Sequence, residues 1–250
     1  MKITHIGGPT AFFSLGGLTF LTDPAFDEPR DYQLPGRVMT KLIGPALPAA
    51  DLGPVDVVLL SHDQHKDNLD ESGRALLPSI PTVLSTPGAA ERIPGVRGLA
   101  TWESVGLADG TVTVTAVPAL HGPEGAEDVL GVVTGFVLQG EGLPTVYVSG
   151  DNASLGLVKE IADRFGPVDV AILFAGAART PLMNGANLTL TSTDAAQAAQ
   201  LLQASTVVPV HTEGWKHFTE GPDQFVAAFR EAGLADRVTL LEHGVATPVG

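Results

Sequence analysis

Hydrophobic residues along the chain gather in short runs, and glycine or proline lies close to the end of most of them. Short runs rich in Val, Leu, Ile and Phe and bounded by turn residues are typical of β-strands. The pattern therefore predicts strands at residues 3–6, 11–15, 18–22, 55–60, 82–85, 112–118, 134–138, 145–149, 168–174, 206–210 and 238–241.

Helical spacing of apolar residues appears in four further stretches, at residues 67–77, 155–165, 193–203 and 223–232. Residues 24–54 are rich in Pro, Gly and Asp, and we expect a long loop there. Both halves of the chain are rich in strands with helices between them. This order favours two mixed sheets packed face to face with helices outside, rather than an open parallel sheet. We therefore expect an α/β (α+β) fold, a four-layer αββα sandwich, formed by one domain over residues 1–250.

Composition narrows the function. The chain has 250 residues, 44% of them hydrophobic and 17% charged, which is typical of a globular enzyme. Its formal charge of −14 argues against nucleic acid and anionic membrane surfaces as partners. No apolar run is long enough to span a bilayer and no secretory signal opens the chain, so we expect a cytoplasmic protein. The absence of cysteine excludes disulfides and thiolate metal ligands.

Side chains of the types that bind metals follow several predicted strands. Four come directly after strand 55–60, and one comes after each of three later strands. These residues are His62, Asp63, His65 and Asp67, then His121, Asp151 and His211. Because strand ends can converge at one edge of a sheet, and rigid strands hold ligands in place, we expect a metal site there.

The donor set indicates which ion would bind. Imidazole and carboxylate ligands suit zinc first, and manganese or iron where oxygen ligands dominate. An aspartate that bridges two ions about 3.5–4 Å apart would help to generate hydroxide from bound water at neutral pH. We therefore expect one or two divalent metal ions, with zinc as the first choice.

These residues carry a resemblance to a known family. Ile3-Thr4-His5-Ile6-Gly7-Gly8, Leu21-Thr22-Asp23-Pro24, Leu59-Leu60-Ser61-His62 and the later His121, Gly150-Asp151 and His211 resemble the metallo-β-lactamase fold superfamily. The likeness is greatest to its lactonase-like and N-acylphosphatidylethanolamine phospholipase D-like hydrolase branch, and it covers nearly the whole chain. It implies an αββα sandwich that holds one or two metal ions at a sheet edge and catalyses hydrolysis.

One stretch departs from the pattern of that family, which is H-x-H-x-D-H. Here the sequence is Ser61-His62-Asp63-Gln64-His65-Lys66-Asp67-Asn68-Leu69-Asp70, with one extra residue in the loop. Aligned backwards from a helix that starts after Asp67, the resemblance makes Asp63, His65 and His121 ligands of one ion. Asp67 and His211 then hold the other, with Asp151 between the two. Aligned forwards, His62 replaces Asp63. We prefer the backward alignment. Asn68 then stands where the family has histidine, and its amide oxygen is a weaker zinc ligand.

Simpler explanations exist for several of these residues. His121 on its own suits a core histidine, Asp151 suits a turn, and Asp67 suits a helix N-cap. Trp215 and His217 follow His211 on a glycine-containing loop, where they would either bind substrate or cover the edge of the core.

The motifs of other enzyme classes are missing. The chain has no phosphate-binding G-x-x-x-x-G-K-[ST] loop, no G-x-S-x-G nucleophile elbow and no dinucleotide fingerprint. We therefore expect a metal-dependent hydrolase that uses metal-bound hydroxide on a small ester, lactone or phosphodiester, with Asp67 orienting the nucleophile. The alternatives are a catalytically degenerate binding or sensing protein on the same scaffold, and an iron site with redox chemistry. Substrate, metal identity and oligomeric state stay open.

Overall fold

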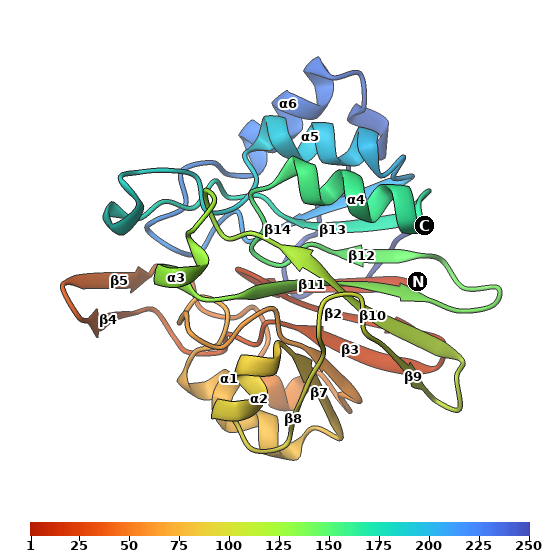
Figure 1. Ribbon diagram of the computed structural model, residues 1–250, viewed down its shortest axis with the longest axis horizontal. Helices are drawn as coiled ribbons and strands as arrows, with labels where there is room; N and C mark the ends of the chain where they lie inside the picture. Colours follow the sequence, from red (N-terminus) through yellow and green to blue (C-terminus); the bar gives the residue numbers. More distant parts are fainter.

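The computed structural model describes residues 1–250 and contains two large sheets that pack face to face (Figure 1). The first sheet has seven strands in the order β15-β1-β2-β3-β6-β7-β8. Its strands are β1 Lys2–Gly7, β2 Thr10–Leu15, β3 Leu18–Thr22, β6 Val57–Leu59, β7 Thr82–Ser85, β8 Val96–Gly98 and β15 Thr247–Pro248. The neighbours from β15 to β3 pair antiparallel and those from β3 to β8 pair parallel, so the sheet is mixed.

The second sheet has six strands in the order β14-β13-β12-β11-β10-β9. Its strands are β9 Ser104–Leu107, β10 Val112–Ala119, β11 Val133–Gln139, β12 Val146–Val148, β13 Val170–Phe174 and β14 Thr206–Val210. Strands β12 to β14 pair parallel, and β9 to β12 pair antiparallel. Strands β10, β12 and β14 consequently run in the same direction, so their carboxyl ends reach the same edge of this sheet.

Helices cover both outer faces, which completes the four layers (Figure 1). They are α1 Glu71–Leu76, α2 Pro87–Arg92, α3 Glu127–Leu130, α4 Leu155–Phe165, α5 Ser192–Leu201 and α6 Pro222–Glu231, with single 3₁₀ turns at Ala49–Asp51, Leu77–Ser79, Pro181–Met183 and Ala235–Arg237. The predicted αββα sandwich is confirmed. None of the helices is both long and apolar enough to cross a lipid bilayer.

Strand β13 illustrates how the sequence produces these layers. All five of its residues are buried, as expected for a strand covered on both faces. Ile172 and Phe174 join the core of 23 buried residues between the two sheets. Ala171 and Leu173 point the other way, into the core under α4, α5 and α6. Because successive side chains alternate between the faces of a strand, one continuous apolar run supplies both cores.

Two predicted elements differ from the observed ones. The helix expected at 67–77 begins only at Glu71, because the Asp70 carboxylate accepts a hydrogen bond from the Gly73 backbone and acts as the N-cap. The strand expected at 238–241 does not form. Val238 makes a single bridge to Val207, and the following residues are exposed or half-buried loop.

The predicted loop 24–54 contains a hairpin, β4 Arg30–Leu34 and β5 Arg37–Lys41, which projects beside the sandwich (Figure 1). The hairpin is mostly polar, so it lacks the apolar run that reveals the other strands. Tyr32 anchors it by donating a 2.7 Å hydrogen bond to the Asp27 carboxylate. Lys41 anchors it through a buried ion pair with Asp70, at 3.1 Å.

Candidate metal centre

Six of the seven predicted ligands lie together at one edge of the sandwich, each in the loop that follows a strand. They form two groups, in each of which one donor atom per residue lies within 4.8 Å of the others. The first group is His62, His65, His121 and Asp151, and the second is Asp67, Asp151 and His211. Asp151 belongs to both groups, so its carboxylate stands between them.

Hydrogen bonds fix how His62 presents its ring. The Ser61 hydroxyl donates to the buried Asp23 carboxylate at 2.5 Å, and Ser61 Oγ lies 2.9 Å from His62 Nδ1. When Asp23 is ionised, the single Ser61 hydroxyl proton goes to Asp23, and His62 Nδ1 carries the proton that joins it to Ser61. His62 Nε2 therefore holds a lone pair, as a metal-binding imidazole requires.

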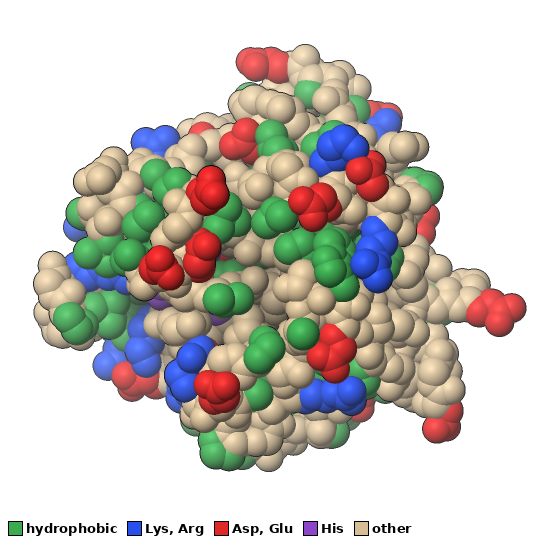
Figure 2. Space-filling model, in the orientation of Figure 1, with side chains coloured by type: hydrophobic (Ala, Val, Ile, Leu, Met, Phe, Trp, Pro, Cys, Tyr) green, Lys and Arg blue, Asp and Glu red, His purple; other side chains and the backbone are tan.

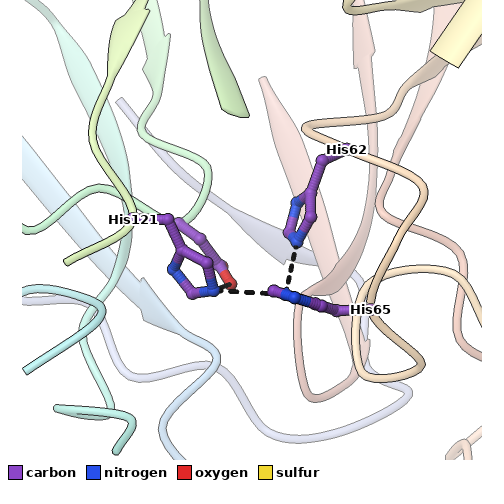
Figure 3. Close-up of side chains that lie close together, drawn as sticks. His62, His65 and His121 are labelled. Atoms are coloured by element: carbon purple, nitrogen blue, oxygen red, sulfur yellow. Dashed lines mark hydrogen bonds and ion pairs between the residues drawn. The ribbon is translucent and has the colours of Figure 1, made fainter. Parts of the chain in front are cut away.

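His121 is held in the same tautomer by a different partner. Its Nδ1 lies 2.9 Å from the Leu188 carbonyl oxygen, which only accepts hydrogen bonds, so Nδ1 carries the proton. The lone pair of His121 Nε2 consequently points into the site. Figure 3 shows the three rings of His62, His65 and His121 converging, with His65 Nδ1 at 2.9 Å from His62 Nε2 and 3.2 Å from His121 Nε2.

The second group combines two carboxylates with one imidazole, all of them buried. His211 Nε2 lies 3.3 Å from Asp67 Oδ2 and 3.8 Å from Asp151 Oδ1. The backbone of His211 adopts a left-handed conformation with φ of +57°, which is uncommon outside glycine and typical of functional sites. Gly150 beside Asp151 also has a φ of +57°, and a Cβ there would come within 2.6 Å of the Thr134 carbonyl oxygen. A glycine is therefore needed to bring the Asp151 loop this close.

Burial and neighbouring charges set the protonation of the site. Burial lowers the pKa of His65 and of His121 to about 4, and places that of His62 well below its usual value. Burial alone would raise the pKa of Asp67, but the adjacent His217 and His211 outweigh it and hold that pKa well below the usual range. The three histidines of the first group are thus neutral and Asp67 is ionised near neutral pH, the forms that bind cations. Burial raises the pKa of Asp151, and although burial lowers the pKa of His211, the Asp151 and Asp67 carboxylates outweigh it and raise that pKa.

The Asn68 side chain bridges two buried carboxylates by hydrogen bonds. Its Nδ2 donates to Asp23 at 2.9 Å and to Asp151 at 3.1 Å, whereas its Oδ1 is buried without a partner. The residue that stands in the histidine position of the family pattern therefore orients the shared carboxylate. Asn68 also ties Asp151 to Asp23, which is itself bonded to Ser61 beside His62.

Asp63 is not part of either group, although we preferred it as a ligand over His62. Its carboxylate forms an ion pair with Arg92, with a shortest N–O distance of 2.5 Å, and lies 3.6 Å from Arg74. The backward alignment assumed a helix that starts after Asp67, but α1 begins at Glu71, so the loop is longer. Within it, His62 reaches the site and Asp63 turns towards α2.

A cavity of about 190 Å³ opens beside the two groups, and His65, Asp67, His121 and His217 contribute to its wall. His217 Nε2 lies 2.9 Å from Asp67 Oδ2, so this histidine lines the cavity and contacts the second group. Trp215, our other candidate for substrate binding, does not line it. Its ring is buried and stacks on Tyr32, with 5.6 Å between ring centroids, so it covers the core edge.

His5, Glu213 and His243 form a third group of metal-binding types. His5 Nε2 lies 3.0 Å from the Gly8 carbonyl oxygen, which also accepts from the His211 backbone N–H at 2.7 Å. His243 Nε2 pairs with a Glu213 oxygen at 2.9 Å. His5 and His243 therefore each have a bonding partner within the protein. Their contacts tie the first strand and the C-terminal segment to the loop that carries His211.

The first two groups fit divalent cations. Several buried polar atoms lack a protein partner, namely Asp67 Oδ1, Asn68 Oδ1, Asp151 Oδ2, His211 Nδ1 and His217 Nδ1. Unpartnered polar atoms are costly in a protein interior unless an ion or ligand satisfies them. Two N–N distances in the first group, from His65 Nδ1 to His62 Nε2 and to His121 Nε2, are 2.9 and 3.2 Å. Ligand atoms around a tetrahedral zinc ion lie roughly 3.4 Å from one another, which is close to these values.

An αββα sandwich with a His/Asp cluster at the edge of its sheets defines a class of metal-binding proteins. A family model described as "Beta-lactamase superfamily domain" matches residues 19–212, and the chain belongs to this family. The expected superfamily is thereby confirmed, whereas the lactonase-like and phospholipase D-like branch stays a prediction.

Two relatives match nearly the whole chain at low identity. A protein of Pelotomaculum thermopropionicum is 29% identical, with 98% of each chain covered, and one of Pyrococcus furiosus is 27% identical, with 98% of this chain and 97% of that protein covered. Both are named metal-dependent hydrolases. The structure of an isothiocyanate hydrolase from Delia radicum gut bacteria aligns with a TM-score of 0.85 at 22% identity, covering 100% of this chain and 99% of that one.

Several residues that line the cavity or orient the ligands have no signal in the sequence. Arg37, Arg179 and Lys216 come from three separate segments and meet only at the cavity. Leu188, whose carbonyl fixes the tautomer of His121, lies 67 residues from it. Asp23, in contrast, does have a signal in the sequence, because it follows a predicted strand and lies in Leu21-Thr22-Asp23-Pro24, one of the stretches that resemble the family.

Proposed function

We propose that this protein, a metal-dependent hydrolase of the β-lactamase superfamily, hydrolyses a small ester, lactone or phosphodiester at the cavity beside His65 and His121. His62, His65, His121 and Asp151 would hold one divalent cation, and Asp67, Asp151 and His211 would hold a second. One observation carries the proposal. His62 and His121, in tautomers set by Ser61 and by the Leu188 carbonyl, turn their unprotonated Nε2 atoms toward the His65 ring. Both atoms lie within 3.2 Å of His65 Nδ1.

Cations held there would supply Lewis acidity and would make water a stronger nucleophile near neutral pH. The side chains of the protein then arrange the reaction. Asp67, whose Oδ2 lies 2.9 Å from His217 Nε2, would orient the attacking water. His217 is a positioning residue for Asp67 and also lines the cavity. The apolar neighbours Leu130 and Leu188 restrict water around the reacting bond.

The donor sets support different ions at the two positions. Three imidazoles and one carboxylate favour zinc in the first group. Two carboxylates and one imidazole make the second group richer in oxygen than the first. Manganese or iron suits the second group better than the first.

Metal content tests this assignment directly. Protein purified without added metal should contain up to two transition-metal ions per chain by elemental analysis. After chelation it should take up zinc or manganese again. His121→Ala should lower the uptake at the first group and His211→Ala at the second, whereas the control His243→Ala removes a histidine outside both groups. Trace metal with no uptake on soaking would instead support the binding or sensing protein.

Hydrolysis should then be measured with metal-loaded protein on matched panels of esters, lactones and phosphodiesters. An isothiocyanate belongs in the panel as a further carbon electrophile, since a protein of the same fold is named for that activity. Turnover that disappears on chelation and returns with metal would identify the substrate class. Metal binding without turnover of any member would leave the metal assignment intact and contradict the proposed substrates.

A further inference from the structure

We propose that the substrate is a small organic anion, whose carboxylate, phosphate or sulfate group is bound by Arg37, Arg179 and Lys216 and whose reacting part lies on an apolar wall. This inference rests on the proposed function, because it assigns a substrate class to the same cavity. It goes further by separating the charge-binding residues from the metal ligands.

The charge around the cavity is opposite to that of the whole protein. The chain carries −14 overall and has 14 basic residues, yet three of the basic residues line this one cavity of about 190 Å³. The only carboxylate in its wall is Asp67, which belongs to the cation site. Figure 2 shows both Lys and Arg side chains and Asp and Glu side chains around the hollow in which histidine is visible. Three basic side chains against one carboxylate make the wall of the cavity itself locally positive, which would attract anions.

The three basic side chains have hydrogen-bond donors that no protein group uses. Arg37 Nη1 donates to the Thr180 hydroxyl at 2.9 Å, and Arg179 Nε donates to Asn187 Oδ1 at 2.8 Å. These neutral partners orient each guanidinium and leave its other N–H groups free. None of the three basic side chains forms an ion pair with a carboxylate. A planar guanidinium with free N–H groups suits carboxylate, phosphate or sulfate oxygens.

Metal binding alone does not explain this arrangement. Positive side chains close to a cation site weaken the binding of the ion by repulsion, so they cost affinity when nothing intervenes. An anionic group placed between the basic side chains and the ions would be attracted by both. The geometry thus favours a bound anion as the natural occupant of the space between them.

The rest of the wall is apolar. Met39 of β5, Leu130 of α3 and Leu188 line the inner cavity, and Val38 is 52% exposed at its edge. Leu182, on the turn next to Pro181 of the wall, is 54% exposed. Exposed apolar side chains beside a pocket mark a surface that binds apolar groups. An inorganic anion would leave this wall unused, whereas an organic anion with a short hydrocarbon part would cover it.

A matched pair of esters tests the proposal. 4-Nitrophenyl butyrate is neutral, and the mono-4-nitrophenyl ester of glutaric acid carries one carboxylate on a chain of similar length. We expect metal-loaded wild-type protein to prefer the anionic ester in kcat/KM. The ratio of anionic to neutral kcat/KM should fall about tenfold in Arg37→Gln or Lys216→Gln, since each loses a charge-assisted contact. Arg97→Gln is the control, because Arg97 is exposed on β8 and does not line the cavity.

A binding measurement separates the anion site from the metal. Hexanoate and its neutral amide, hexanamide, are titrated calorimetrically into chelated, metal-free protein, where a carboxylate has no metal to bind. We expect hexanoate to bind more tightly than hexanamide, and this preference to disappear in the Arg37→Gln, Arg179→Gln, Lys216→Gln triple variant.

The outcomes distinguish the two proposals. If both esters are hydrolysed and the ratio stays unchanged in both Arg37→Gln and Lys216→Gln, the anionic substrate is refuted and hydrolysis stands. If neither ester is hydrolysed, the metal-free titration decides the inference alone. Equal affinity of wild-type protein for hexanoate and hexanamide there would overturn it, whatever the metal-loaded protein hydrolyses.

Discussion

The choice between His62 and Asp63 is the sharpest consequence of the structure. The two residues are neighbours in sequence, but His62 faces the first ligand group whereas Asp63 pairs with Arg92. We therefore expect His62→Gln to weaken metal binding and Asp63→Asn to leave it nearly unchanged. Both changes keep side-chain size close to the original, so the comparison isolates the lost ligand from the lost ion pair.

The expected magnitudes follow from what each side chain contacts. Loss of a residue that only supports a ligand costs about 10–100-fold in metal affinity, so loss of the His62 imidazole itself should cost at least about 100-fold, or ~2.7 kcal/mol. Asp63 is 3% exposed and accepts charge-assisted bonds from Arg92, which is itself 45% exposed. Its replacement by Asn should destabilise the fold by about 1–2 kcal/mol, with the affinity for zinc within about threefold of wild type.

The assay is competition of each apo-protein with a chromophoric chelator for zinc, together with thermal unfolding of the metal-free proteins. Asp63→Asn should lower the Tm by about 3–6 °C in a chain of this size. The opposite result, in which Asp63→Asn loses zinc and His62→Gln retains it, would refute the geometry and restore the alignment that makes Asp63 the ligand.

Three other predictions test the surroundings of the site. Asn68→Leu removes the donor shared by two buried carboxylates, so it should lower metal affinity about 10–100-fold in the same chelator competition. Lys41→Met leaves the Asp70 carboxylate buried without its cation, and chemical denaturation should show a loss of about 3 kcal/mol that Asp70→Asn partly restores in the double variant. Glu213 raises the pKa of His243 above 6.5, so His243→Gln should cost stability chiefly below about pH 6.5. That cost, about 0.5 kcal/mol for a partly exposed pair, should vanish as pH rises through the raised pKa, in thermal unfolding from pH 5.5 to 9.

Much of the fold could be predicted from the sequence because burial leaves a local pattern. Strands such as β13 are covered on both faces and therefore appear as continuous apolar runs. The same runs end abruptly at polar ligand types, which indicated where His121, Asp151 and His211 would stand. Their convergence needed only the rule that strands running in one direction end at one edge.

The hairpin β4–β5 left no comparable pattern. Its residues are mostly polar, and its anchors are the Tyr32 bond to Asp27 and the Lys41 pair with Asp70, which lies 29 residues further along the chain. Such partners are chosen by packing between distant segments, so periodicity within a window of sequence does not reveal them.

Tertiary structure also decided which residues serve the site. Arg92 lies 29 residues beyond Asp63 and draws that carboxylate away, which leaves His62 to complete the first group. Tyr32 covers Trp215, while His217 reaches the cavity from the same loop. The sequence by itself determined the sandwich and the residue types at its edge, because these depend on local burial. The side chains that face the cavity depend on contacts between distant segments, and only the folded chain specifies those.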